Sequence, residues 1–519
     1  MIKRHLSNAT WNISSLLLQT GAILAATPII LKGIGLEGYG ILMLVNTLVG
    51  FNGLAAFGLA DATVKQIASA RARDDLAFIT GVVRTTMALY IPLSFIFVVA
   101  LYFGSLFLVD KVFHVEPSST AAAVSALQAG AFIFLIRVFE SVFSAVLQGF
   151  ELYGLVARIE LFTSVFALVL QCFLASSGHG VLPLTLATGF GILLSAIAKL
   201  GFGIARCVSA RAFVPGLQKD LLKPLFSFGL FSWFQTLNGV ITGQADRLLL
   251  ASMLDVKALA AYTIALRVAS FIHMIPTRAA SFLFPVAAYQ AEQGNTAALR
   301  NTYFTAQNIT TSFGTAMAVT IFLLASPLLT LWVGPKVSSE AAPVLRLLTI
   351  VYACLATTIV PYYYMNGSGF VRLNTVFGTL ASIISIGLTY LGIPRFGVIA
   401  PAGAQLCSHV MSFIAYPILH RRLFGDNRWY VGFSVLSPLF GSFAIALLVQ
   451  NLIPAKFTLF EFFSIAVFLF CMIFPVALIL SSGLNTPPDT KGTEAVRVVL
   501  SKIKMALNFV KVKVPFVRL

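Results

Sequence analysis

The chain has 519 residues, of which 58% are hydrophobic and only 10% are charged. A soluble globular domain carries about 25% charged residues, so this composition excludes a soluble protein and indicates one that lies in a membrane. The formal net charge is +17. In a membrane protein such an excess is explained first by basic loops on the cytoplasmic side, so it does not indicate a nucleic-acid partner.

Apolar runs of helical length recur from Trp11 to Ser481. Each run has about 20–28 residues, enough to cross a hydrocarbon core about 30 Å thick at a rise of about 1.5 Å per residue. Strands of a β-barrel would have about ten residues of alternating polarity, so the pattern predicts an all-α polytopic membrane protein. Fourteen spans are predicted, at residues 10–31, 38–60, 83–109, 121–148, 157–177, 182–205, 224–251, 258–288, 304–333, 343–366, 374–393, 399–420, 432–453 and 460–481.

Lysine and arginine are concentrated in alternate loops and at the two ends of the chain. This bias predicts that both termini are cytoplasmic. The tail at 482–519 is basic and amphipathic, which is typical of a helix on an anionic membrane surface. No predicted loop is long enough to form the extramembrane domain that membrane glycosyltransferases use, and the cysteines form no C-x-x-C pair. The pattern therefore disfavours an enzyme and indicates no metal site.

Two segments resemble each other at an offset of 223 residues. ATWNISSLLLQTG, from Ala9, aligns with SWFQTLNGVITGQ, from Ser232, and Tyr39 then falls on Tyr262. The polar residues are spaced i, i+3, i+7 in each copy, which places them on one helix face. The aligned polar positions are Asn12 with Gln235, Ser15 with Asn238 and Gln19 with Thr242.

This repeat predicts two six-helix bundles, arranged as parallel repeats around an axis along the membrane normal, with two further helices after them. The predicted parts are a first bundle at 1–205, a basic cytoplasmic linker at 206–223, a second bundle at 224–420, helices 13 and 14 at 421–481, and the cytoplasmic tail at 482–519.

Charged residues inside the spans are the candidate functional residues, because a charge at the centre of a membrane helix costs roughly 2.5–3.5 kcal/mol. Arg137 lies about 4 Å from the midpoint of its span and precedes Glu140 by three positions. Two interpretations stay open for this pair: an ion pair that ties helices together, or a pair that lines a water-filled cavity. Lys199 and Arg346 lie near span ends and are expected to extend toward the membrane surface.

Two further regions of the spans carry charge. In GVITGQADRLLLASM, Asp246 extends the polar stripe, and Arg247 points about 100° away, either to the outer interface or into the cavity. Arg267 and Arg278 are three helical turns apart and would point the same way, about 16 Å from each other. The predicted cavity residues are Arg137, Arg247, Arg267, Arg278, Glu140, Asp246, Gln235, Asn238, Thr242, Asn12 and Gln19.

Such a cavity would be net cationic and would suit an anionic cargo, because the planar guanidinium group donates two hydrogen bonds at once to phosphate or carboxylate. Serine, threonine, asparagine and glutamine in the stripes would meet hydroxyl groups. A lipid diphosphate that carries sugars satisfies both requirements.

Three segments resemble the polysaccharide-exporter branch of the multidrug/oligosaccharidyl-lipid/polysaccharide (MOP) flippase superfamily. They are GIGLEGYGILML at 33–44, FGLADATVKQIA at 57–68 and QADRLLLASMLDVKALAAYTIALRV at 244–268. The matching residues are Tyr39 and Gly40 after the first span, Gly58, Leu59, Ala62 and Lys65 at the second, and Gln244, Asp246, Ala261 and Tyr262 in the third segment. Lys65 departs from the pattern, in which arginine is common.

The resemblance implies two six-helix bundles in a V shape around a cationic lumen, with alternating access. It implies a flippase for an undecaprenyl-diphosphate-linked oligosaccharide, which moves from the cytoplasmic to the periplasmic leaflet of a bacterial inner membrane. Beyond this cargo and the membrane lipid, a polysaccharide polymerase and a chain-length regulator are the implied partners. No cofactor is expected, and coupling to a proton or sodium gradient stays open.

Three alternatives remain. A multidrug exporter of the same superfamily moves organic cations, so the excess of arginine over acids disfavours it. A peptidoglycan-precursor flippase suits an anionic cargo equally well, and only the local motifs speak against it. A membrane glycosyltransferase or polymerase would need a large periplasmic loop.

Overall fold

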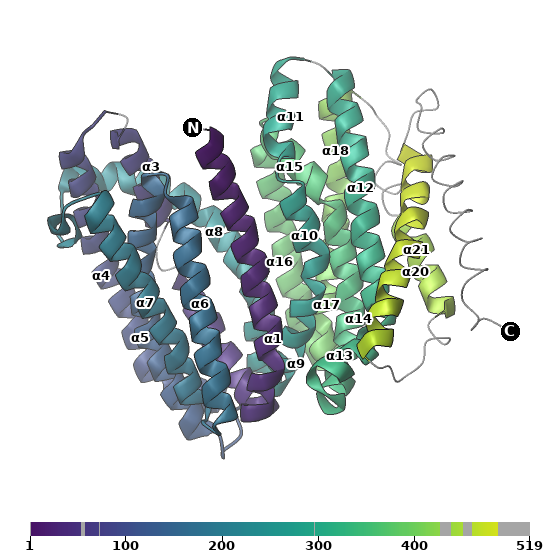
Figure 1. Ribbon diagram of the computed structural model, residues 1–519, viewed down its shortest axis with the longest axis horizontal. Helices are drawn as coiled ribbons and strands as arrows, with labels where there is room; N and C mark the ends of the chain where they lie inside the picture. Colours follow the sequence, from purple (N-terminus) through teal and green to yellow (C-terminus); the bar gives the residue numbers. More distant parts are fainter. Residues whose placement is uncertain are drawn as a thin grey trace. The chain divides into compact units, whose positions relative to one another are not determined.

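The computed structural model describes residues 2–52, 58–71, 73–294, 296–425, 437–449 and 459–485. The regular elements of this part are all helices (Figure 1). Nine of its helices are long and apolar enough to cross a membrane, or ten if a bent pair counts as one span. The protein is therefore an all-α polytopic membrane protein, as predicted. The number of fourteen spans stays a prediction, because part of the thirteenth span and the tail after residue 485 lie outside the described residues.

The chain folds into two compact units. Unit 1 comprises Met1–Thr263 with Ile393–Val398, and unit 2 comprises the described residues of Ile264–Gly392 and Ile399–Leu519. The boundary between the two units lies between Thr263 and Ile264, inside a helix, whereas the sequence predicts a boundary at the linker 206–223. The two predicted six-helix bundles were inferred from a sequence repeat. The division into compact units does not test that repeat, so the bundles stay a prediction.

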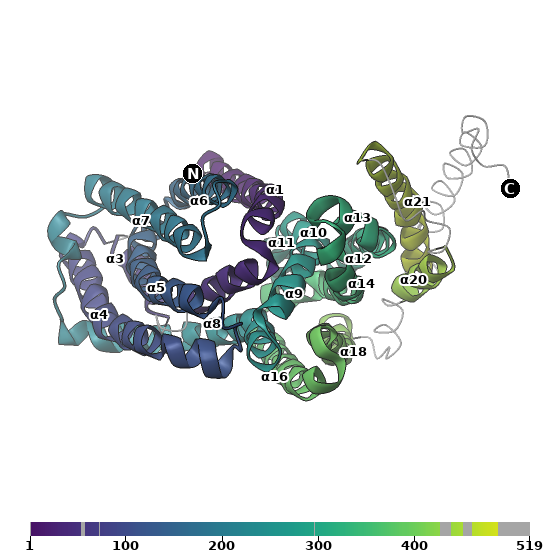
Figure 2. The ribbon, with the colours of Figure 1, turned by 90° about the horizontal axis from the view of Figure 1, so that it is seen from below.

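Unit 1 is built of long antiparallel helices (Figures 1 and 2). In it α5 packs against α4 and α7, and α6 packs against α1 and α7. Helix α8, which the sequence places at the start of the second bundle, packs against α3. The elements are α1 (Ile2–Val49), α3 (Leu59–Arg71), α4 (Leu76–Phe107), η1 (Leu108–Val112), α5 (Thr120–Gly149), α6 (Tyr153–Ser176), α7 (Val181–Arg206), η2 (Ala210–Phe213), α8 (Lys219–Met253) and the first part of α9 (Val256–Ala269).

Glycines set the shape of α1. Gly35 has φ 70° and ψ 178°, a backbone conformation that favours glycine, and this residue divides α1 into two legs. The division falls between the first two predicted spans. At Gly33 a Cβ atom would lie 2.4 Å from the carbonyl oxygen of Ala175, so only glycine lets α1 approach α6 this closely.

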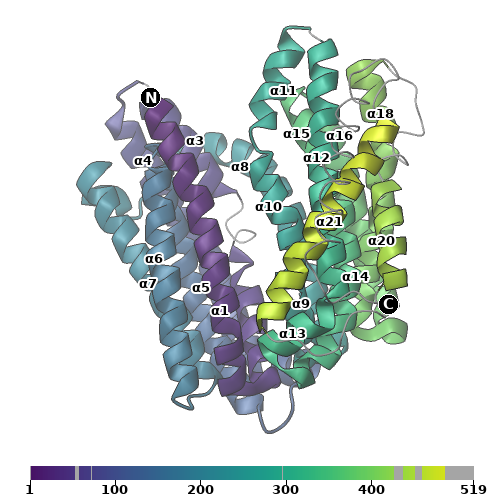
Figure 3. The same ribbon diagram turned by 45° about the vertical axis from the view of Figure 1, so that its right-hand side comes forward.

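Unit 2 is organised around α12, which packs against α14, α20 and α21 (Figure 3). The remaining elements are α10 (Phe271–Ala279), α11 (Leu283–Glu292), α12 (Thr296–Leu323), α13 (Ala325–Val333), α14 (Pro335–Thr357), α15 (Ile359–Gly367), α16 (Val371–Phe396), η3 (Gly397–Ile399), α17 (Ala400–Ser408), α18 (Val410–Phe424), α20 (Ser437–Val449) and α21 (Leu459–Asn485).

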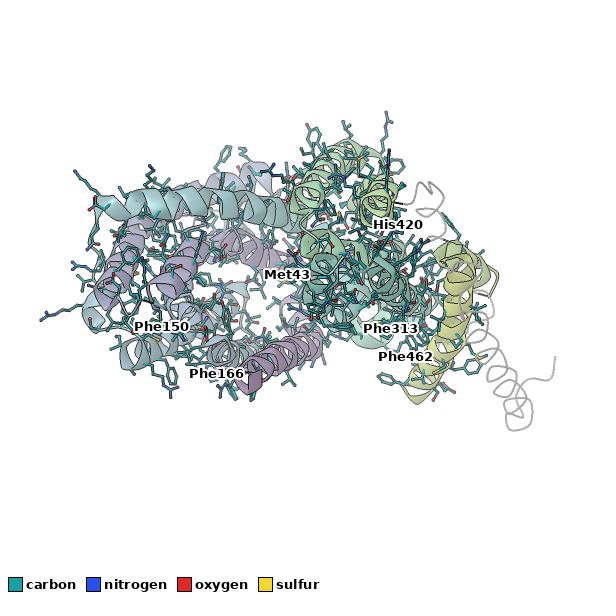
Figure 4. All side chains as sticks on the ribbon, turned by 90° about the horizontal axis from the view of Figure 1, so that it is seen from above. Met43, Phe150, Phe166, Phe313, His420 and Phe462 are labelled. Carbon is teal, nitrogen blue, oxygen red and sulfur yellow. The ribbon has the colours of Figure 1, made fainter. Side chains whose placement is uncertain are left out.

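Aromatic rings form part of the core of unit 2. Tyr303 on α12 packs edge-on against Tyr364 on α15 and His420 on α18, with ring centroids 5.0 Å apart in both pairs. Figure 4 labels His420. His420 and the hydroxyl of Tyr303 are also within hydrogen-bond distance, 3.2 Å. Such pairs add to the free energy of burial and tie three helices together.

Several predicted spans are interrupted in the structure. The span predicted at 258–288 ends earlier, because α9 and α10 form one candidate span at Val256–Ala279 and α11 begins anew at Leu283; α12 and α13 meet at a bend of 68°. The assumption of one uninterrupted helix was wrong there. Proline is the physical cause at one such place, the junction of α14 and α15: Pro361 has no N–H to donate to the carbonyl of Thr357.

Candidate functional site

Four charged residues of unit 1 form a row of alternating sign, which we call the charge chain: Arg137, Glu140, Lys199 and Glu160. A guanidinium nitrogen of Arg137 lies 3.0 Å from Oε2 of Glu140. The ammonium of Lys199 lies 2.5 Å from Oε1 of Glu140 and 2.8 Å from Oε1 of Glu160. The hydroxyl of Ser195 donates to the same Oε1 of Glu140, at 2.7 Å.

The middle of the charge chain is buried and its ends are exposed. The side chains of Lys199 and Glu140 are 0% and 4% exposed, whereas those of Arg137 and Glu160 are 43% and 47% exposed. A buried charge must be paired and hydrogen-bonded, and each buried member has an opposite charge on both sides. The expectation that Lys199 extends to the membrane surface was wrong, because two carboxylates hold its ammonium inside the unit.

Helices α5, α6 and α7 bring the charge chain together at one depth. Glu140 lies about 14 Å from the end of α5, and Lys199 lies about 10 Å from the end of α7. Glu160 lies about 10 Å from the start of α6, which follows α5 after a short turn. The structure therefore brings Arg137 and Glu140 into contact, as their spacing predicts. Sequence reasoning missed Ser195 and Glu160; the only signal was that both lie in spans.

The adjacent charges of α8 have separate partners. Asp246 is 5% exposed and accepts a hydrogen bond of 3.1 Å from the hydroxyl of Tyr262 on α9. The guanidinium of Arg247 donates to the side-chain oxygen of Gln244, one turn earlier, at 2.9 Å. Four residues of the family-like segment thus form two separate pairs, and Asp246 ties α8 to α9 within unit 1.

The other predicted site residues lie elsewhere in the fold. Gln19 on α1 and Arg267 on α9 are half-buried, and Arg278 is exposed at the end of α10. Arg267 lies on α9 and Arg278 at the end of α10, and the two helices follow one another through Ser270 as one candidate span, Val256–Ala279. The side chains of Asn12, Gln235, Asn238 and Thr242 lie outside the described part of the structure.

A second ionic cluster lies at the other end of unit 1, opposite the basic loops. Lys257 at the start of α9 forms ion pairs with Glu116, in the segment before α5, and with Glu37 on α1. The hydrogen bond and the positive charge of Lys257 lower the pKa of the Glu116 carboxyl below its usual value. Sequence reasoning placed Lys257 in an outside loop and missed its two partners, because they come from segments far from it in the chain.

The structure explains the family-like motifs near α1 and α3 as packing. At Gly40 a Cβ atom would lie 1.9 Å from the carbonyl oxygen of Val256, so the backbones touch. Gly58 has φ 67° and begins the turn that leads into α3, where Leu59 and Ala62 are fully buried. These residues therefore shape the fold.

A surface pocket of about 350 Å³ lies where α4 begins and α7 ends. It is lined by both polar and apolar side chains, and burial raises the pKa of the Cys207 thiol to about 11. None of the predicted cavity residues lines it. In the described residues, no three His, Cys, Asp or Glu side chains are placed to hold a metal ion. The pocket lining is Leu76, Thr80, Ile204, Arg206, Cys207, Val208 and Ser209.

Solved structures of transporters share this fold. The inward closed form of the lipid II flippase MurJ has a TM-score of 0.68 at 13% identity, with 90% of this chain and 97% of that chain covered. The inward-facing form of a multidrug resistance MATE family transporter of the MOP superfamily has a TM-score of 0.65 at 18% identity, covering 80% and 98%. At such identities the likeness establishes the fold alone, an all-helical membrane transporter fold.

The sequence comparisons identify the family. A family model described as "Polysaccharide biosynthesis protein" matches residues 34–342, more than half of the chain. A Shigella flexneri protein named "Putative O-antigen transporter" is 20% identical over 416 residues, 76% of this chain and 93% of that protein. The protein thus has the fold of these membrane transporters. It belongs to the polysaccharide biosynthesis protein family.

These findings confirm several predictions. The resemblance to a polysaccharide flippase is confirmed, and the similar proteins are named as transporters and flippases rather than as enzymes. It is a multi-pass membrane protein.

Proposed function

We propose that the protein flips an oligosaccharide linked to undecaprenyl diphosphate from the cytoplasmic to the periplasmic leaflet of a bacterial inner membrane, by alternating access. Membership of the polysaccharide biosynthesis family supports an oligosaccharide cargo, and the name of the Shigella flexneri relative supports an O-antigen-like one. A polymerase and a chain-length regulator would then act on the delivered repeat units, and a proton or sodium gradient would drive the transport cycle.

The main support for this proposal is the exposure and hydrogen bonding of the Arg137 side chain. Its side chain is 43% exposed although it lies near the middle of α5, and one of its nitrogens is used by Glu140. In the described part of the structure, its remaining N–H groups are left to water or to a ligand. The guanidinium group has five N–H donors in one plane, and these match the oxygens of a diphosphate better than the compact charge of a lysine ammonium does. A lipid diphosphate is therefore the cargo that this arginine would recognise.

The other proposed cargo contacts divide between the units. Arg247 and Asp246 belong to unit 1, and Arg267 and Arg278 belong to unit 2. Asn12, Gln19, Gln235, Asn238 and Thr242 complete the proposed set as hydroxyl-binding residues.

The test compares arginine variants for glycan display. R137A and R267A should abolish surface glycan while the protein still inserts into the membrane at normal levels, and lipid-linked oligosaccharide should accumulate in the cells. R137K should restore only part of the display, because an ammonium cannot reproduce the planar fork. The matched control is R346A, since Arg346 is an exposed arginine on α14 outside the proposed site. Normal glycan display in R137A and R267A would contradict the proposal.

The same strains separate the alternatives. A multidrug exporter predicts that loss of the protein sensitises cells to organic cations and leaves glycan display unchanged. A peptidoglycan-precursor flippase predicts lysis with accumulation of the cell-wall precursor. The proposed function predicts neither result.

A further inference from the structure

A single hydrogen bond joins Arg137 to Glu140. The two residues are three positions apart on α5, so they share a helix face. A carboxylate in such a position can accept two parallel bonds from a guanidinium group and neutralise it. Here Glu140 gives Arg137 only Oε2, at 3.0 Å. Its other oxygen is already occupied.

Two side chains of α7 occupy that oxygen. Ser195 and Lys199 are four residues apart on one face of α7, and both donate to Oε1 of Glu140, at 2.7 and 2.5 Å. Lys199 is fully buried and has Glu160 on its other side, at 2.8 Å. The negative charge of Glu140 is therefore shared between one buried cation and one exposed cation.

We propose that Lys199 and Ser195 are positioning residues: they hold Glu140 so that Arg137 stays fixed yet only partly neutralised, and can present its free N–H groups to an anionic phosphate. This inference rests on the proposed function, because it assigns support to the arginine that would meet the cargo. Arg137 touches the cargo, and Lys199 and Ser195 act through Glu140.

Removal of the Lys199 charge should redirect the whole carboxylate to Arg137. K199M keeps the length of the side chain and removes the ammonium, so Glu140 closes on Arg137 and the affinity for a phosphate ligand falls. The double variant E140Q/K199M removes both buried charges, which frees Arg137 and restores the affinity. E160Q removes the negative charge on the other side of Lys199, so the ammonium interacts with Glu140 alone. Glu140 then neutralises Arg137 less, and the affinity for a phosphate ligand should rise.

The experiment measures binding of farnesyl diphosphate, a short polyprenyl diphosphate, to the purified full-length protein, together with its melting temperature. We expect K199M to bind about tenfold more weakly, a difference of about 1.4 kcal/mol, and E140Q/K199M to bind within about threefold of the parent protein. A folded K199M with unchanged affinity would overturn the inference, even if its melting temperature is lower, because a purely structural role predicts that pattern.

A second variant decides the question if K199M cannot be purified. E160Q changes an exposed side chain, and tighter binding by E160Q supports the inference, since loss of a merely structural contact would not raise affinity. Unchanged or weaker binding overturns it. R137A separates this inference from the proposed function: if R137A binds normally, the proposed cargo site is wrong, whereas weak binding by R137A with normal binding by K199M defeats the positioning role alone.

Discussion

Gly40 shows how one residue can fix the contact between two helices. The carbonyl oxygen of Val256 lies 1.9 Å from the place where a Cβ atom would stand, and backbone cannot move aside as a flexible side chain could. We expect G40A to lower the free energy of unfolding by about 1–3 kcal/mol, as overpacking of a close contact does. Thermal unfolding of the purified protein measures this change.

Gly104 provides the control for that variant. It lies inside α4, and a Cβ atom there would meet nothing within 4 Å. G104A should leave the melting temperature unchanged or raise it, because alanine favours the helix by roughly 0.5–1 kcal/mol over glycine. Equal melting temperatures for G40A and G104A would contradict the packing explanation.

The ion pair between Lys257 and Glu116 gives a pH dependence of defined sign. Lys257 lowers the pKa of Glu116 from its usual value of 4.5. A carboxyl whose pKa is lower in the folded protein stabilises it above the ordinary pKa, and this contribution disappears as the pH falls through the lowered value. The melting temperature of the parent protein should exceed that of E116Q by a constant amount from pH 8 to pH 6.

Below pH 4.5 that difference should close, because Glu116 becomes protonated in both the folded and unfolded protein. A difference that already closes between pH 8 and pH 6 would show that another group is responsible. The charge swap E116K/K257E keeps the pair and should restore the melting temperature that K257E alone lowers, since K257E would place a third acid beside Glu37 and Glu116.

Single residues also show why the charge chain could be predicted only in part. The spacing of Arg137 and Glu140 indicates a pair on one face, because helix geometry fixes that relation within one segment. Lys199 looks like a residue that extends to the membrane surface, since its distance from the span end allows it. Which face of α7 turns inward depends on the packing of α5 and α6, which no local pattern contains.

At the scale of elements, helix ends follow from the sequence and internal breaks do not. The spans predicted at 121–148, 157–177 and 182–205 agree closely with α5, α6 and α7. Charged, glycine and proline residues mark those ends, because they disfavour the apolar core or the helix itself. The break between α14 and α15 lies within an apolar run, where only Pro361 signals it, and proline alone does not say whether a helix kinks or ends.

Side chains from two other helices repair that break. Pro361 has no N–H to donate to the carbonyl of Thr357. This carbonyl instead accepts a hydrogen bond of 2.8 Å from the side-chain amide of Gln307 on α12 and one of 2.7 Å from the hydroxyl of Tyr416 on α18. Either donor alone satisfies the carbonyl, so Y416F and Q307L should each cost little, about 0.6 kcal/mol, the average for a hydrogen bond inside a membrane protein. Thermal unfolding of purified variants measures both.

Together the two changes should cost more than their sum. In Q307L/Y416F the buried carbonyl loses both donors, and an unsatisfied buried polar group costs about 1–3 kcal/mol. Y362F is the matched control, because Tyr362 lies one residue from Pro361 and is 49% exposed. Strictly additive losses in the double variant would show that the carbonyl of Thr357 has another donor.

At the scale of the whole molecule, the distribution of charge predicts the orientation in the membrane. The segment between α7 and α8 contains Arg211 and lies at one end of unit 1, while the turn after α6 begins at Ser177 and lies at the opposite end. Basic loops stay in the cytoplasm. In a variant without its native cysteines, S177C should react with an impermeant maleimide on intact spheroplasts, and S209C only after permeabilisation, because both positions are exposed. The reverse labelling pattern would place the basic loops outside, and the proposed direction of transport, from a cytoplasmic entrance, would lose its basis.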